Sequence, residues 1–182
     1  MIYLPLVSEG YEWINCCDGA DYEIFDSFDG SPRRDTWTPV QVRRVRASPQ
    51  QAFIRSDFPW LGDHALMFRQ PALDALRQML LPNGEILPLA TEDMTPLYVL
   101  NVTRIIDALD LKRSEIIRFP GSDRIMLIRS AVMFEPLVRS VDVFRLPHRA
   151  SSTYVSNRFV QTVQECGLEG IEFHPVELSV TE

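Results

Sequence analysis

The hydrophobic positions of the chain fall into short runs, most of which have the length and composition of β-strands. Runs rich in apolar, aromatic and β-branched residues predict strands at 2–7, 11–17, 64–69, 85–90, 98–102, 116–119, 124–129, 141–146 and 171–178. Turn-forming residues 8–10 predict a hairpin between the first two runs. Residues 120–123, Pro-Gly-Ser-Asp, predict a second hairpin between 116–119 and 124–129.

Two stretches have the spacing of amphipathic helices. Residues 71–81 begin with a proline, which suits a helix start, and 156–166 has Ser156 or Asn157 as a candidate N-cap and Gly167 as a candidate stop. Their predicted core faces comprise Leu73, Leu76, Met79 and Leu80 in the first and Phe159, Val160 and Val163 in the second. A short helix or turn is also expected at 105–109.

Each helix lies between two predicted strands, so the sequence predicts two β-α-β-like units. The fold class that follows is α+β, with mixed, mainly antiparallel sheets and a few short helices. Each unit is entered by a Phe-Arg pair, at 68–69 and 144–145, and leaves through a glycine and a strand that reaches Pro88 or Pro175. An internal duplication would explain this plan, and chance similarity would explain it too.

Residues 40–46 interleave valines with arginines, a pattern typical of an exposed edge strand that charge protects from aggregation. The following segment 57–60, Asp-Phe-Pro-Trp, is aromatic and irregular, and it is expected to pack against the body of the protein.

With 182 residues, of which 46% are hydrophobic, the chain can form one domain over 1–182 without metals or disulfides. The length also allows two lobes, a β-rich part at 1–56 and a second part at 57–182. The first residues lack the basic region of a secretory signal, and no apolar run reaches the roughly 18 residues of a membrane span. A cytoplasmic protein that needs no cofactor is therefore expected.

The formal net charge of −7 argues against binding to nucleic acid or to an anionic membrane and favours a basic protein partner. The sequence does not indicate an oligomeric state.

The acidic charge is concentrated at 18–29, which contains five acidic residues, no basic residue and aromatic residues at spacings of three. An anionic surface with aromatic anchors would attract a basic partner. The alternative is a solvated face whose aromatic side chains turn into the core. A calcium site is disfavoured because the EF-hand pattern is missing. The candidate partner-binding residues are Asp18, Asp21, Tyr22, Glu23, Phe25, Asp26 and Asp29.

The sequence offers little that would support catalysis. The glycines are too scattered for a phosphate-binding loop, and the three histidines lack the spacing of metal ligands. Asp107 and Asp110 would share a face only if 105–109 is helical, and a solvated helix end explains them better. The three cysteines are expected to be free thiols. The remaining enzyme hypothesis uses Cys16 or Cys17 as nucleophile with His64 or His174 as base.

The order of segments in the second half resembles a family of bacterial immunity proteins that accompany polymorphic toxins, including contact-dependent and type VI secretion toxins. The segments that carry the resemblance are 57–58, 65–68, 98–102, 107–110, 143–146, 154–156 and the closing 167–176, Gly-Leu-Glu-Gly-Ile-Glu-Phe-His-Pro-Val. The resemblance implies a non-enzymatic antitoxin that binds one cognate toxin. A small thiol enzyme and an adaptor that pairs through the 40–46 strand remain the alternatives.

Overall fold

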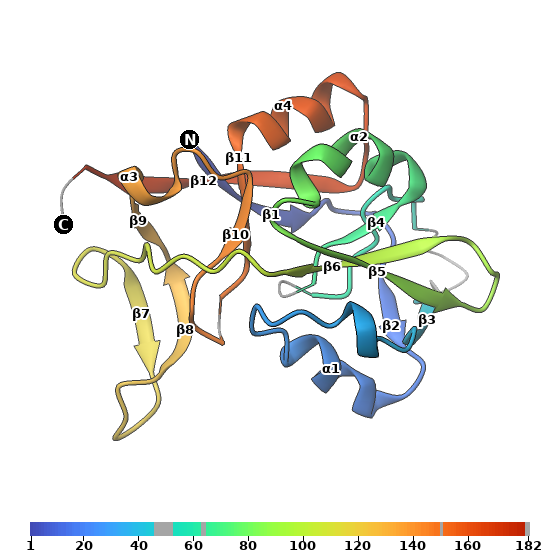
Figure 1. The fold of residues 1–182 in the computed structure, drawn as a ribbon, viewed down its shortest axis with the longest axis horizontal. Coiled ribbons are helices and arrows are strands. Elements are labelled where there is room, and N and C mark those ends of the chain that lie inside the picture. Colours follow the sequence, from blue (N-terminus) through green and yellow to red (C-terminus); the bar gives the residue numbers. More distant parts are fainter. Residues whose placement is uncertain (46–52, 63–64, 150, 181–182) are drawn as a thin grey trace.

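The computed structural model describes residues 1–45, 53–62, 65–149 and 151–180, and it shows two five-stranded sheets, a separate hairpin and short helices (Figure 1). The predicted α+β class is confirmed. Most neighbouring strands are antiparallel, and each large sheet also contains one parallel pair.

The first sheet has the order β10-β11-β1-β12-β9. Its strands are β10 (Val143–Arg145), β11 (Thr153–Ser156), β1 (Ile2–Val7), β12 (Ile171–Ser179) and β9 (Val132–Phe134). The N-terminal strand β1 therefore lies between two strands from the C-terminal part of the chain. A division into lobes at residues 56 and 57 does not follow this sheet.

The second sheet has the order β2-β3-β5-β6-β4. Its strands are β2 (Ile14–Cys16), β3 (Gln41–Arg44), β5 (Gly84–Thr91), β6 (Leu97–Val102) and β4 (Met67–Arg69). The hairpin predicted from the turn at 8–10 is wrong, because β1 and β2 belong to different sheets. Residues just before β2 pair elsewhere, as Trp13 does with Trp60.

The prediction of an exposed edge strand at 40–46 is also wrong for residues 40–45. Arg46 lies outside the described residues. Strand β3 lies between β2 and β5, and Val42 is fully buried. The arginines beside it project to solvent from an inner strand, so they do not mark an edge.

Two helices lie side by side over the sheets, α2 (Gln70–Leu80) and α4 (Asn157–Glu165), as the top of Figure 1 shows. Their predicted core faces are confirmed, and they share one hydrophobic core with the strands beneath. Ser156 is the N-cap of α4, because its hydroxyl accepts the N–H of Phe159 at 3.2 Å. Gly167 has a positive φ after the last turn, as a helix stop requires.

The remaining elements surround this body. The predicted hairpin is confirmed as β7 (Glu115–Arg118) and β8 (Ile125–Ser130), and Figure 1 shows it projecting away from both large sheets. The short elements are η1 (Gly19–Asp21), α1 (Tyr22–Asp26), η2 (Arg34–Thr36) and α3 (Glu135–Val138).

Residues 105–109 form no helix, but the Ala108 N–H donates to the Ile106 carbonyl at 3.0 Å and closes a three-residue turn. Of the predicted helix or turn, the helix is wrong. The segment also pairs with neighbouring strands: Ile106 donates to the Arg145 carbonyl at 2.9 Å, and the next residue after the segment, Asp110, donates to the Val132 carbonyl at 2.9 Å. Asp107 and Asp110 consequently do not share a helix face.

The two β-α-β units have the same split topology. In one, β4 and β5 flank β6 and are joined by α2; in the other, β11 and β12 flank β1 and are joined by α4. The outer strands β3 and β9 add in parallel to β5 and β12 respectively. The first sheet thus repeats four strands of the second.

Equivalent contacts support this correspondence. A shift of 87 residues relates Gln70 to Asn157 and Pro88 to Pro175. Pro88 lies opposite Tyr98, whose hydroxyl donates to the Gln70 side chain at 3.1 Å. Pro175 lies opposite Tyr3, whose hydroxyl donates to the Asn157 side chain, also at 3.1 Å.

The two Phe-Arg pairs are not equivalent, although the sequence suggested it. Phe68-Arg69 is in β4, directly before α2, whereas Phe144-Arg145 is in β10, one strand before the second unit. The residue equivalent to Arg69 is Ser156.

Candidate functional site

The acidic stretch folds into η1, α1 and the following turn, which cover one face of the second sheet. Phe25 and Phe28 are 2% and 3% exposed, and their rings contact each other edge-on at 5.8 Å and pack against Trp37. Of the two hypotheses for this stretch, the one in which the aromatic side chains turn into the core is confirmed for Phe25 and Phe28. Phe25 is therefore not a surface anchor, which corrects its place among the candidate partner-binding residues.

The acidic side chains around these rings face the solvent. Asp18, Glu23, Asp26 and Asp29 are exposed, and Asp21 and Tyr22 are half-buried. Two acids have local structural tasks: Asp18 accepts the N–H of Ala20 at 2.9 Å, and Asp29 accepts the N–H of Ser31 at 3.0 Å.

Hydrogen bonds from the Ser31 hydroxyl and N–H lower the pKa of Asp29, so it is charged at neutral pH. The carboxylates of Asp21 and Glu23 form no hydrogen bond or ion pair with any residue that the structure describes. These two charges are therefore available to a partner.

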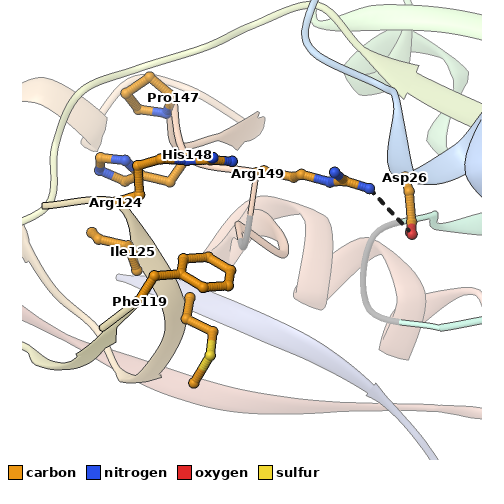
Figure 2. A pocket seen from close by; sticks show the side chains of 8 residues that line it. Asp26, Phe119, Arg124, Ile125, Pro147, His148 and Arg149 are labelled. Atoms are coloured by element: carbon orange, nitrogen blue, oxygen red, sulfur yellow. Dashed lines mark ion pairs between the residues drawn. The ribbon is translucent and has the colours of Figure 1, made fainter. Parts of the chain in front are cut away.

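A cleft separates this acidic face from the β7–β8 hairpin. Two adjoining hollows of about 380 and 460 Å³ share Asp26, Pro147, His148 and Arg149 as lining residues. Figure 2 shows the smaller hollow, with Arg149 reaching across it toward Asp26 at 3.8 Å. Both side chains of this ion pair are largely exposed, so it contributes little to stability and can open.

The wall opposite the acids is basic and apolar. Arg124 lies 5.6 Å from the ring centre of Phe119, near the tip of the hairpin, and Met126 follows on β8. Phe119, Met126 and Leu127 are 43–46% exposed, which is high for such apolar side chains. Large apolar side chains on a projecting hairpin are typical of a protein interface.

Sequence reasoning predicted this hairpin but did not select its side chains as site residues. The available signal was the lack of alternation: apolar residues occupy 116, 117 and 125–128 in succession, so both faces of the hairpin are apolar. One face, with Ile116, Ile125 and Ile128, packs against the core, and the other remains outside.

The floor of the cleft is held by a buried arginine. Arg145 is 3% exposed and donates to the Phe28 carbonyl at 2.7 Å and to the Ser151 carbonyl at 2.9 and 3.2 Å. Burial lowers its pKa, and the negative charges of Asp26 and Asp29 oppose that effect. These two acids therefore stabilise a buried charge in addition to facing the cleft.

The thiol hypothesis gains no geometric support. Cys16 is buried in β2, and burial, followed by the nearby Asp21 and Cys17, raises the pKa of its thiol to about 11. Cys17 and Cys166 are exposed. His174 is on β12 of the other sheet, 4.0 Å from Glu172, and His64 lies outside the described residues. Among the residues described, no cysteine is hydrogen-bonded to a histidine.

Within the described ranges, no group of three or more His, Cys, Asp or Glu side chains is arranged to hold a metal ion. None of the helices in those ranges is long and apolar enough to cross a membrane.

The cleft thus combines charged and exposed apolar side chains, a combination that is typical of protein-binding surfaces. A match to a family model is more specific. Residues 91–178, about half of the chain, match the model of the Immunity protein family (Imm11). The resemblance to bacterial immunity proteins is confirmed over this stretch, and it implies toxin immunity.

Immunity proteins of this kind are typically non-catalytic and imply a cognate toxin as partner. The matched stretch contains the hairpin and the 145–149 wall of the cleft but not the acidic stretch at 18–29. No curated protein matches the chain at a significant level.

Proposed function

We propose that this protein neutralises a cognate bacterial toxin in the cytoplasm by binding it, without covalent chemistry, through the cleft between α1 and the β7–β8 hairpin. The observation that carries the proposal is the pairing of two unlike walls at this cleft. One wall has Glu23 of α1, whose carboxylate has no hydrogen-bond or ion-pair partner among the described residues, beside Asp26 and Asp29. The other has exposed apolar side chains on a projecting hairpin.

The acidic wall suits a basic partner. The carboxylates of Asp21 and Glu23 have no hydrogen-bond or ion-pair partner among the described residues; Asp21 ends η1, and Glu23 is in α1, which the buried Phe25 anchors to the core. Charges held by a rigid element steer association without a cost of ordering them, so they act mainly on the association rate. Toxins that attack nucleic acids often have basic active sites, and an acidic inhibitor would cover such a site.

The hairpin supplies the apolar part of the interface. Phe119, Met126 and Leu127 would be buried against the toxin and would mainly lower the dissociation rate. The family match includes these residues, while the acidic stretch lies outside it. We infer that the hairpin gives general affinity and that the acidic stretch contributes to the choice of toxin.

Co-expression with the product of the adjacent gene tests the function itself. The expected result is that this product stops growth when expressed alone, that the present protein restores growth, and that the two co-purify. The proposal would be contradicted if the product is toxic and the present protein neither restores growth nor binds it.

Two matched double variants test the site. Asp21→Asn with Glu23→Gln is expected to reduce the association rate roughly tenfold at low salt and to weaken its salt dependence. Glu92→Gln with Glu165→Gln removes the same charge from exposed positions on other elements and should leave the rate nearly unchanged. Equal rates for the two variants would exclude the α1 surface. Stopped-flow measurements at several salt concentrations give these rates.

A further inference from the structure

The outer edges of the two equivalent strands β5 and β12 differ in how much of each edge other segments of the chain cover. Residues 33–40 run along the edge of β5. The N–H of Arg33 donates to the Glu85 carboxylate at 2.6 Å, and the indole of Trp37 donates to the Pro88 carbonyl at 2.8 Å. Farther along, Ala90 donates to the Val40 carbonyl at 3.0 Å, where β3 begins to pair with β5.

On the equivalent edge of β12, strand β9 pairs only with residues 177–179. No strand of the described ranges pairs with 171–176 on the side away from β1. Residues 125–131, which precede β9 as 33–40 precede β3, belong mainly to the projecting β7–β8 hairpin.

The backbone groups on this edge can be assigned from two prolines. Pro175 lies opposite Tyr3, and Pro5 lies opposite Phe173. Because proline has no N–H, these are not the hydrogen-bonded pairs of the antiparallel ladder. The N–H and C=O of Phe173, the C=O of Pro175 and, two residues earlier, the groups of Ile171 therefore point away from β1.

A carboxylate on this edge is equivalent to one that binds the covering segment in the other unit. Glu172 is equivalent to Glu85 by the shift of 87 residues. Glu85 accepts the backbone N–H groups of Arg33 and Arg34 in the covering segment. The Glu172 side chain is 54% exposed, and among the described residues its ion-pair partner is His174, at 4.0 Å. A groove of about 540 Å³ between α4 and β12 leaves room next to the strand.

We propose that the edge of β12 at 171–176 binds a basic, extended segment of the toxin, which adds to the first sheet as residues 33–40 add to the second. The inference rests on the proposed function and assigns a second contact to the same partner. The backbone of the segment would pair with Ile171 and Phe173, and its basic side chain or N–H groups would bind Glu172.

The charge of the edge selects this occupant. The counterpart Glu85 binds the backbone N–H groups of residues 33 and 34, and among the described residues Glu172 has no such donor. A basic segment would bring both N–H groups and a positive charge to the Glu172 carboxylate. A donor side chain that reaches the Pro175 carbonyl, as Trp37 reaches Pro88, would complete the match.

Hydrogen–deuterium exchange on the free protein and on its complex with the co-expressed toxin tests the edge directly. The amides of Ile171 and Phe173 are expected to exchange rapidly in the free protein and at least tenfold more slowly in the complex. Protection of these amides in the free protein that grows with its concentration would instead show pairing with a second copy and would overturn the proposal.

A matched pair of variants separates binding from folding. Glu172→Lys is expected to weaken toxin binding at least tenfold without changing the urea midpoint. Glu85→Lys should lower the urea midpoint, because Glu85 anchors the chain's own segment. Its affinity for the toxin should be unchanged, measured where the variant is folded.

The outcomes also distinguish this inference from the proposed function. A wild-type complex in which Glu172→Lys binds normally and Ile171 and Phe173 stay unprotected would overturn the edge contact alone. A protein that forms no complex with the toxin would overturn the proposed function, and the edge contact with it.

Discussion

The two split β-α-β units have one architecture and different surroundings. Around β5, the chain covers both the edge, with residues 33–40, and the adjoining face, with α1. Around β12, the equivalent edge is open and the equivalent of the buried Leu87 is His174, which is 60% exposed. The comparison teaches that the same strand edge can be part of the protein's own packing or open to a partner. Which of the two holds depends on whether another segment of the chain covers the edge.

The largest effect is expected from breaking the buried ion pair in the covered unit. Arg69, at the end of β4, donates from Nε to the buried Glu12 carboxylate at 3.1 Å, whereas the equivalent Ser156 caps a helix with no buried charge. Glu12→Gln leaves the Arg69 charge uncompensated and should lower the free energy of unfolding by about 3 kcal/mol in urea titrations.

The exposed pair Glu115–Arg129 provides the control for this change, since its side chains are more than half exposed. Glu115→Gln should change the free energy of unfolding by less than about 0.5 kcal/mol. A similar loss in the free energy of unfolding for Glu12→Gln and Glu115→Gln would show that burial of the ion pair does not determine the size of the effect.

A second large effect is expected where α4 turns into β12. Gly170 has φ +97°, and an added Cβ would lie 1.9 Å from the Ser56 hydroxyl oxygen. Gly170→Ala must therefore displace the segment around Ser56 and should cost about 2–4 kcal/mol.

Gly167 provides the matched comparison in the same connection. It also has a positive φ, +62°, but an added Cβ would meet nothing within 4 Å. Gly167→Ala should cost only about 1 kcal/mol, from backbone strain alone. Equal midpoints for the two variants in urea would contradict the predicted clash.

A smaller, pH-dependent effect is expected at the covered edge. Burial on its own would raise the pKa of Glu85, but hydrogen bonds from the Arg33 N–H, the Asn101 amide and the Arg34 N–H lower it on balance. A carboxyl whose pKa is depressed on folding stabilises the protein above its unfolded pKa, near 4.5, and loses that contribution as the pH falls through the folded value.

Glu85→Gln should therefore lower the free energy of unfolding by about 1 kcal/mol at pH 7, and the difference from wild type should shrink as the pH falls below 4.5. Glu172→Gln, on the open edge, should show no such difference. Urea titrations at several pH values provide the measurement.

The smallest effect concerns reactivity and not stability. Cys16 and Cys17 are neighbours, but alternation in and after β2 buries the first and exposes the second. With the Cys16 pKa raised to about 11, its thiolate is scarce at pH 8. A thiol reagent should label Cys17 and Cys166 rapidly and Cys16 only on unfolding; rapid labelling of all three would revive the enzyme hypothesis.

Local patterns were sufficient to predict the two longer helices, most strands and the β7–β8 hairpin, but not the pairing of strands far apart in the sequence. The faces of α2 and α4 follow from helical spacing, whereas the partners of β1 lie about 150 to 175 residues away and leave no local signal. The valines and arginines of β3 suit an exposed edge and an inner strand with one solvated face equally well, and only the fold decides between them.

The duplication was hard to align for a related reason. Between the two aligned units only Leu81 and Leu168, Glu85 and Glu172, and Pro88 and Pro175 are identical at the shift of 87 residues. Topology and the two tyrosine hydrogen bonds reveal what these positions alone could not.

The acidic side of the candidate site was predictable because its charge is contiguous in sequence. Its partner wall was not, since Phe119 and Met126 are about a hundred residues away and meet α1 only through folding. The burial of Phe25 likewise depends on Trp37 and the sheet beneath it.

The central place of β1 has a consequence for synthesis. Residues 2–7 are synthesised before residues 171–176, with which they pair. The first sheet cannot close before residues 171–176 have emerged, so β1 lacks its β12 partner until then. For the proposed function, this long-range closure means a delay between synthesis and toxin binding, which favours making the inhibitor before its toxin.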